Sequence, residues 1–580
     1  MTENTDKNSC FRSRFAPFLY ACILWSVAFS SHAQSATPEQ EYSRYLTAAQ
    51  SITPLSSLGD QVSLRDGTLS FRQVDVELPG IGPTIRIVRT FRVVGRIGRI
   101  KDTSGNSMGE WELALPRLKT LTNGTTGTLV VGPKGWQVGD GSDARCTEMD
   151  RPGMITRPKV DPVEAEAWWG GYQLVEDSGE EETVLGGGSY SSSPAHVATT
   201  KGYWLITCLA STSNGLPGEA FQAIAPDGTR YWLDHLVYKT APSAGSTLNR
   251  KYGSMLVTRI EDRFGNWVAY HYSATGILDA IDASDGRRVT LANNGYNITS
   301  ATVVSAAGNR TWTYQYSTQD AQGALTSMVL PDGTSWQFSL DGLFYIGMPL
   351  QTSGNCNGAV QNDGLTGTTR TGSITSPSGA TATYALRTLH IGRSYIPMAC
   401  FSPVEGYAPY AEIPKDSWGY ALSSKTVSGP GLSQATWTYS YSSGNSSWSS
   451  DCSGGCATTV WTDVTNPDGV RNRSIFSNRF DGSENLLLRT ETYPAQPGAA
   501  VQAADTVYAI SPPDETNSPY PWRSVGFDFT PRSNWQVSER WTPAQSTTVT
   551  QDGRAFQRVV NSYDMYARPL SVTKSSAPSP

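Results

Sequence analysis

The chain has 580 residues, which is more than one hydrophobic core usually serves, so its size predicts several domains or one extended array. It contains 55 Gly, 34 Pro, 27 Tyr and 17 Trp, a usage typical of β-strands joined by tight turns rather than of helices. The formal net charge of -6 is spread without long runs of one sign. This pattern excludes the basic patch of a nucleic-acid-binding protein.

Residues 1–33 have the pattern of a signal peptide. Basic residues precede an apolar stretch from Phe15 to about Ser30, and Ser31-His32-Ala33 then offers a small-residue cleavage site. The alternative, a retained membrane anchor, is disfavoured because the stretch contains Pro17 and is shorter than the roughly 20 residues needed to span a bilayer. We therefore expect export to the periplasm, cell surface or extracellular space, with membrane contact only through this signal. A polar spacer is expected over 34–54.

Residues 55–210 are predicted to form an N-terminal β domain. Leu64–Phe71 is typical of a strand, an Asp-Gly turn and a second strand, and Val74–Leu78 and Ile85–Phe91 continue with period-two alternation. The region also holds a dense acidic segment from Glu164 to Glu182 beside two tryptophans. Paired carboxylates would suit sugar hydrolysis, but a charged sheet edge that suppresses strand pairing is the favoured interpretation.

A repeated phrase organises residues 211–494. It is clearest in Asp262–Tyr272, where an Asp-x-x-Gly turn at Gly265 leads into an aromatic strand ending Tyr270-His271-Tyr272. A second turn at Gly276 and a third at Gly286 follow, the latter 21 residues after Gly265. One such unit cannot bury its own apolar face, so the repetition predicts an array of units.

Two strands of the array are almost identical. Thr311–Tyr316 and Thr436–Tyr441 agree at five of six positions. Alternation places their aromatic side chains on one face of the strand: Trp312, Tyr314 and Tyr316 in the first, Trp437, Tyr439 and Tyr441 in the second. A buried sheet face is the favoured interpretation, and a sugar-stacking platform is the alternative.

The array is interrupted and then resumes. Residues 495–534 are rich in Pro and Ala and are predicted to form an excursion or linker. Residues 535–580 then contain a last repeat, marked by Tyr563, Asp564 and Arg568.

Six cysteines remain after removal of the signal, an even number that suggests disulfides in an exported chain. They permit fifteen pairings. The simplest is sequential, joining Cys146 to Cys208, Cys356 to Cys400, and Cys452 to Cys456. Metal binding is disfavoured, because only the last two are close and no histidine lies near them.

No catalytic, cofactor-binding or metal-binding residue is predicted. The chain has five histidines, and none accompanies a Gly-x-Ser-x-Gly nucleophile elbow. Asp282–Gly286 offers oxygen ligands but lacks the distal bidentate acid of a calcium loop, so a turn is favoured.

The repeats resemble the RHS repeat, also named the YD repeat for its Tyr-Asp pair. Tyr563–Leu570 matches the family phrase except that Ala567 replaces a glycine, and Tyr270–Leu278 matches with Ser273 in place of the Asp. The resemblance implies a mainly β fold, in which an N-terminal β region leads into a curved array of antiparallel strand-turn-strand repeats. Such a spiral wall encloses a C-terminal toxin in some family members, while others sit on the cell surface.

The family's closing self-cleavage motif has no match here, since the nearest string, Asn466–Val470, lies inside the array. The favoured function is an exported structural or binding module acting in intercellular contact or glycan binding. One alternative is the N-terminal part of a toxin-delivery shell of a polymorphic toxin system, whose partner would be a toxin or continuing shell encoded nearby. A second alternative is a secreted glycan-active enzyme.

Overall fold

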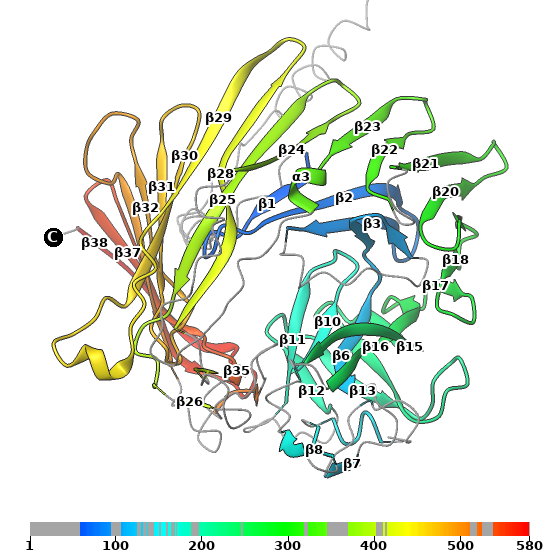
Figure 1. The fold of residues 1–580 in the computed structure, drawn as a ribbon, viewed down its shortest axis with the longest axis horizontal. Coiled ribbons are helices and arrows are strands. Elements are labelled where there is room, and N and C mark those ends of the chain that lie inside the picture. Colours follow the sequence, from blue (N-terminus) through cyan, green and yellow to red (C-terminus); the bar gives the residue numbers. More distant parts are fainter. Residues whose placement is uncertain are drawn as a thin grey trace, which may run out of the picture. The chain divides into compact units, whose positions relative to one another are not determined.

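Antiparallel β-strands account for nearly all the regular structure of the computed structural model. It describes residues 58–93, 106–123, 129–131, 136, 144–149, 152–157, 160–163, 169, 171–186, 196–244, 248–317, 323–344, 369–398, 400–401, 410–411, 415–510, 519–524 and 538–578. The predicted signal peptide and the spacer over 34–54 lie outside these residues. The prediction of a mainly β chain with a large curved antiparallel sheet is confirmed (Figure 1).

The first described strands form a small sheet of their own, named sheet A here. Its strand order is β1-β2-β3-β5-β4. Its members are β1 (Asp60–Val62), β2 (Leu69–Leu78), β3 (Ile85–Arg92), β4 (Ser107–Met108) and β5 (Trp111–Leu113).

The next strands begin a second, much longer sheet, and eight of them close into a ring. Closure occurs because β6 pairs with β10 on one side and with β16 on the other. The ring strands are β6 (Arg117–Asn123), β10 (Tyr172–Val175), β11 (Glu181–Leu185), β12 (Ala198–Thr200), β13 (Leu205–Leu209), β14 (Ala220–Ile224), β15 (Arg230–Ala244) and β16 (Leu248–Glu261).

From β16 the sheet continues strand by strand in chain order, a run named the ladder here. It consists of β17 (Trp267–Tyr272), β18 (Leu278–Ala283), β19 (Arg288–Asn293), β20 (Ile298–Val304), β21 (Arg310–Tyr316), β22 (Leu325–Val329), β23 (Ser335–Ser339), β24 (Arg370–Thr375), β25 (Thr381–Gly392), β28 (Asp416–Gly429), β29 (Leu432–Tyr441), β30 (Thr459–Thr465), β31 (Arg471–Ser477), β32 (Leu487–Tyr493), β33 (Gln502–Tyr508), β36 (Ala544–Gln551), β37 (Arg554–Tyr563) and β38 (Pro569–Pro578).

Three small sheets and two short helices complete the described elements. They are β7 (Leu129–Val131), β8 (Met154–Arg157) and β9 (Val160–Val163), then β26 (Cys400–Phe401) with β27 (Tyr410–Ala411), β34 (Trp522–Ser524) with β35 (Ser538–Arg540), the α-helix α3 (Asp341–Phe344) and the 3-10 helix η4 (Ser449–Cys452).

Pairing crosses two of the boundaries drawn from the sequence. The ring runs through residue 210, because β13 pairs with β14 on the far side of it. The segment predicted as an excursion or linker, 495–534, contains β33, which pairs with β32 and β36 as a regular member of the ladder and includes Ala503 and Ala504.

The predicted Asp-Gly turns form because the aspartate carboxylate caps the turn it opens. Asp262 Oδ1 accepts hydrogen bonds from the amides of Phe264 and Asn266 at 2.8 and 2.9 Å. Gly265 and Gly286 have φ of 85° and 86°, a region that side chains rarely adopt. Nothing lies within 4 Å of a Cβ built on either, so the backbone angle alone requires glycine there.

Ladder hairpins share a second feature, a β-bulge near one end of a strand. Five tyrosines each donate a hydrogen bond from Oη to the carbonyl of the residue just before a bulge in the neighbouring strand. The pairs are Tyr272 with Val257 (2.7 Å), Tyr316 with Ile298 (2.5 Å), Tyr441 with Leu422 (2.7 Å), Tyr508 with Leu487 (2.8 Å) and Tyr563 with Ala544 (2.8 Å). Since a bulge interrupts the ladder bonds locally, the hydroxyl supplies a donor where strand pairing is interrupted.

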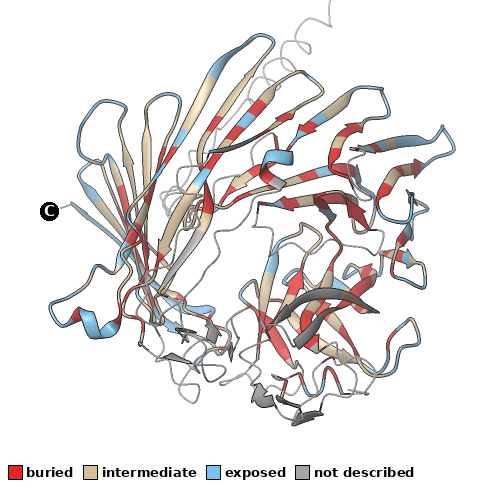
Figure 2. Cartoon of the chain, in the orientation of Figure 1, coloured by how far each residue is buried: buried red, intermediate tan, exposed pale blue. Residues whose placement is uncertain are grey.

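The apolar core lies between sheet A and the face of the ladder and ring that it contacts, called the inner face here (Figure 2). Phe71 of β2 packs edge-on against Tyr384 of β25, with ring centroids 5.0 Å apart. Trp111 of β5 packs against Phe338 of β23 at 5.6 Å. Within the ring, Trp136 packs against Phe221 at 5.3 Å, so aromatic side chains from both regions join one core.

We predict that Tyr316→Phe or Tyr441→Phe destabilises the protein by about 1 kcal/mol, because each substitution removes one hydrogen bond to a backbone carbonyl. Thermal or denaturant unfolding followed by circular dichroism measures the effect. Tyr296→Phe is the matched control, since Tyr296 is 48% exposed. Equal unfolding of all three variants and the parent chain would contradict the bridging role of the hydroxyls.

Candidate functional site

Sheet A is attached to the ladder by buried charges that sequence reasoning did not find. Asp75 on β2 accepts a hydrogen bond from Arg89 Nε of β3 at 2.9 Å and one from the Tyr314 hydroxyl of β21 at 3.0 Å. The side chains of Arg89 and Asp75 are 0% and 1% exposed. The Arg89 guanidinium lies 4.3 Å from the Trp111 ring centroid and also bonds Gln73. Burial raises the pKa of Asp75, while the charge of Arg89 opposes this rise.

A second buried pair lies farther along the ladder. Lys425 of β28 contacts both carboxylate oxygens of Asp60 of β1, at 2.7 and 2.9 Å. Tyr384 donates to Asp60 Oδ1 at 2.8 Å. Asp75 contacts Tyr314, 239 residues away, and Asp60 contacts Tyr384 and Lys425, 324 and 365 residues away. These contacts fix the N-terminal strands onto the repeats.

The bulges carry a further set of contacts with the N-terminal segment. At four bulges the amide of the residue before the bulge donates to a group from residues 67–116. The pairs are Val257 with the Pro116 carbonyl (3.0 Å), Leu278 with Asn106 Oδ1 (2.9 Å), Leu325 with Glu110 Oε2 (2.8 Å) and Leu422 with the Gly67 carbonyl (2.9 Å). The N-terminal segment therefore follows the row of bulges from strand to strand.

Three loops at one end of the strands form the candidate site, named the loop cluster here: 393–398, 442–458 and 478–486. The first loop lies between the other two. Ser394 forms a bridge with Arg479, and Ile396 forms one with Trp448. The amide of Ser394 donates to the Asn478 carbonyl at 2.8 Å, and that of Ser449 donates to the Ile396 carbonyl at 2.8 Å.

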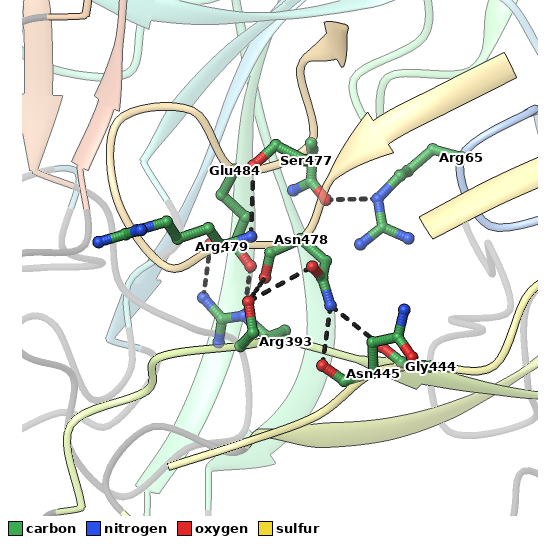
Figure 3. A network of polar contacts seen from close by, with 10 residues as sticks. Arg65, Arg393, Gly444, Asn445, Ser477, Asn478, Arg479 and Glu484 are labelled. Carbon is green, nitrogen blue, oxygen red and sulfur yellow. Dashed lines mark hydrogen bonds and ion pairs between the residues drawn. The ribbon is translucent and has the colours of Figure 1, made fainter. Parts of the chain in front are cut away.

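Polar side chains fill the space between these loops (Figure 3). Arg393 makes a two-point contact with Glu484, with distances of 2.5 and 2.8 Å. Asn478 Nδ2 donates to the carbonyls of Gly444 and Asn445 at 3.1 and 3.0 Å. Arg65, from the β1–β2 turn, donates to Asn485 Oδ1 at 2.8 Å. The cluster is thereby connected to the N-terminal segment as well as to the ladder.

Cations stack on aromatic rings around the same loops. Arg479 lies 4.3 Å from the Tyr395 ring centroid, and Arg393 lies 5.0 Å from that of Phe480. Burial lowers the pKa of Arg65, and the nearby charges of Glu484 and Asp66 partly restore it. This arrangement combines flat aromatic faces with fixed cations.

Positive φ angles also occur here, a region that asparagine adopts readily but tyrosine does not. Among the described residues other than glycine, six have positive φ, and three of them belong to the loop cluster: Tyr395 (60°), Asn445 (52°) and Asn485 (65°). A bulky residue such as tyrosine adopts this conformation only when its surroundings enforce it. Strain of this kind is associated with sites where geometry matters for function.

The predicted repeat residues do not gather into a site; they line the sheet. Tyr270, Tyr314 and Tyr439 are buried on the inner face, and Trp312 and Trp437 pack against the same core. Tyr272, Tyr316, Tyr441 and Tyr563 make the carbonyl contacts described above. Gly265, Gly276 and Gly286 form turns with positive φ. Asp564 caps its turn by accepting the amides of Tyr566 and Arg568 and pairs with the Arg568 side chain at 2.6 Å.

Two of the three sequential disulfides are formed, Cys146 with Cys208 and Cys452 with Cys456. The pair of Cys356 with Cys400 lies outside the residues whose side chains are described. The cysteine pair in residues 452–456 is a sequence signal within the loop cluster, and a weak repeat unit at Gly482–Leu487 is another.

The other residues weighed as catalytic or metal-binding candidates form local ion pairs. His271 pairs with Asp282 at 2.9 Å, and Asp285 pairs with Arg287 in the next turn. In the acidic segment, Glu181 contacts Lys119 at 2.5 Å, while residues 164–168 lie outside the described ranges. Over the described parts of the chain, no three His, Cys, Asp or Glu side chains are placed to hold a metal ion. No helix among those residues has the length and apolarity to cross a membrane.

No protein-family model matches the chain, and no curated protein matches it. Solved structures align weakly: one described as TcdB2-TccC3-TEV at 9% identity and TM-score 0.24, covering 95% of this chain and 28% of that one, and one described as TcdB2-TccC3 at 11% identity and TM-score 0.21, covering 88% and 30%. This chain thus spans less than a third of the length of either. Alignments at this level carry no inference about function.

We predict that Asp75→Asn destabilises the protein by about 3 kcal/mol, because it leaves the buried Arg89 guanidinium without a compensating charge. Adding Arg89→Met in the same chain should recover part of the loss. Unfolding in denaturant measures both variants. A double variant no more stable than Asp75→Asn alone would contradict the account of an uncompensated charge.

We also predict a pH dependence from His235, a buried residue of β15 whose ring lies 4.8 Å from that of Tyr272. Burial lowers its pKa below the ordinary value of 6.5. Unfolded chains then bind more protons than folded ones below about pH 6.5, so stability falls as the pH falls. The thermal midpoint should drop between pH 7.5 and 5.5, and His235→Phe should reduce that drop. An identical drop in the variant would remove His235 as the cause.

Proposed function

We propose that this chain is an exported RHS-repeat structural and binding protein, in which the ladder is a rigid wall and the loop cluster is the surface that contacts a neighbouring cell or a glycan. The observation that carries the proposal is the attachment of sheet A along the row of bulges, reinforced by the buried Asp75–Arg89 and Asp60–Lys425 pairs. This attachment makes the wall rigid, because buried hydrogen bonds and ion pairs join distant parts of the chain.

The loop cluster supports a binding role for a separate reason. Loops held by a rigid scaffold are where proteins most often place recognition residues. Here the loops combine strained backbone at Tyr395 with an arginine side chain, Arg479, that is 47% exposed and stacked on an aromatic ring. The proposal assigns no catalytic residue.

The test is a binding assay with the whole chain, including the predicted signal peptide over 1–33, produced in a bacterial host. Fractionation and protease accessibility of intact cells would report export. Adhesion to bacterial cells and binding to a panel of glycans would report recognition. Arg479→Ala should lower binding at least tenfold, since it removes an exposed guanidinium that stacks on Tyr395 and pairs with Asp481 at 2.9 Å, without touching the ladder.

Arg288→Ala is the matched control, because its side chain is 49% exposed but lies on β19, away from the loops. A chain retained in the cytoplasm, or equal binding by both variants and the parent, would defeat the proposal. Export without adhesion, together with co-purification of a toxin encoded nearby, would instead favour the toxin-delivery alternative that the RHS resemblance suggests.

A further inference from the structure

The loop 442–458 contains a small disulfide ring formed by Cys452 and Cys456. The three residues between them, Ser453, Gly454 and Gly455, are exposed, and Cys456 is half-buried. Nothing lies within 4 Å of a Cβ built on either glycine. The described residues therefore leave this ring open to an attacking thiol.

The other described disulfide joins a fully buried residue to a strand. Cys146 is fully buried, and Cys208 is a half-buried residue of β13 that pairs with Phe221 of β14, whereas Cys452 and Cys456 lie in one loop, four residues apart. A thiol attacking Cys208 must approach a paired strand, whereas a thiol attacking Cys456 approaches an exposed turn.

The surroundings of Cys452 can also accommodate a reduced sulfur. Its Sγ lies 3.3 Å from Ser447 Oγ and 3.2 Å from the Trp448 carbonyl. After reduction the thiol has the carbonyl as acceptor, and the thiolate has the hydroxyl as donor. Cys452 is only 8% exposed, so the half-buried Cys456 is the sulfur that an external thiol can reach.

We propose that Cys452–Cys456 is a thiol–disulfide exchange site whose substrate is a dithiol, such as a protein bearing a Cys-x-x-Cys pair. A thiolate of the dithiol attacks Cys456 Sγ, the Cys452–Cys456 bond breaks, and Cys452 leaves as a thiolate. The second thiolate of the dithiol then attacks the mixed disulfide, which releases the oxidised dithiol and the Cys456 thiolate. Two electrons pass from the dithiol to the disulfide.

Exchange at this site would act on the loop cluster. The Cys456 amide donates to Tyr395 Oη at 3.2 Å, and Trp448, next to η4, bridges to Ile396. Opening the disulfide removes the covalent link between Cys456, which makes the first contact, and Cys452, which follows Trp448 by four residues. Reduction is therefore expected to loosen residues 393–398 and 442–458 while the ladder stays folded.

The first test is a titration of the whole oxidised chain with dithiothreitol, followed by alkylation and mass spectrometry of the peptides. Cys452 and Cys456 should be alkylated at a reductant concentration at least tenfold below that needed for Cys146 and Cys208. Reduction of both disulfides at the same concentration, or of Cys146–Cys208 first, would overturn the proposal.

The second test uses single-cysteine variants with oxidised glutathione as the probe. Cys452→Ser leaves the accessible Cys456, and Cys456→Ser leaves the buried Cys452. Glutathione should add to the first at least tenfold faster than to the second. Equal rates would refute the assignment of Cys456 as the attacked sulfur.

Hydrogen exchange keeps the proposal falsifiable if either single variant is poorly folded. The reduced parent chain and the oxidised parent chain are compared under conditions that leave Cys146–Cys208 intact. Exchange should rise at least severalfold in residues 393–398 and 442–458 and stay unchanged in β20–β22. An unchanged loop cluster, or a general rise across the ladder, would overturn the coupling.

Discussion

The buried contact of Asp75, Arg89 and Tyr314 is the constraint on which the rest of the structure depends. A guanidinium and a carboxylate that are both desolvated tolerate little displacement, because either one left without its partner costs several kcal/mol. Both charges belong to sheet A, and the hydroxyl of Tyr314, on a repeat strand, donates to Asp75, so this hydrogen bond to the buried pair holds sheet A at one position along the ladder. The Asp60–Lys425 pair then fixes it at a second position, on β28.

From β30 onward a different arrangement joins the strands. The Asp463 carboxylate of β30 forms ion pairs with both Arg471 and Arg473 of β31, at 3.0 and 2.7 Å. Arg489 of β32 contacts Glu491 of the same strand and Asp505 of β33. These pairs are partly exposed, so each contributes little alone and the network contributes more than a single pair would. The ladder therefore combines buried fixing in its first part with cross-strand charge pairing in its later part.

The sequence predicted the strands and turns because both follow local rules: alternation for Thr311–Tyr316 and an aspartate cap for Asp262–Gly265. It also predicted which aromatic side chains share a face. It could not predict that Asp75 and Arg89 are buried together, since Val74–Val76 and Ile85–Phe91 show the same alternation as half-exposed strands. Their partner, Tyr314, is 239 residues from Asp75, and no local pattern reports such a contact.

The sequence did not predict the loop cluster, because its contacts also join residues far apart in the chain. Tyr395, with a positive φ of 60°, lies beside two contacts from loop 442–458: Ile396 is bridged to Trp448, and the Cys456 amide donates to the Tyr395 hydroxyl. Within that loop the disulfide closes residues 452–456, which hold the second contact. The Tyr395 amide also donates to Ser447 Oγ at 3.1 Å, and its ring stacks on Arg479, so opening the disulfide would remove one restraint on this residue and leave others. The proposed exchange at Cys452–Cys456 would therefore loosen the proposed contact surface rather than unfold it.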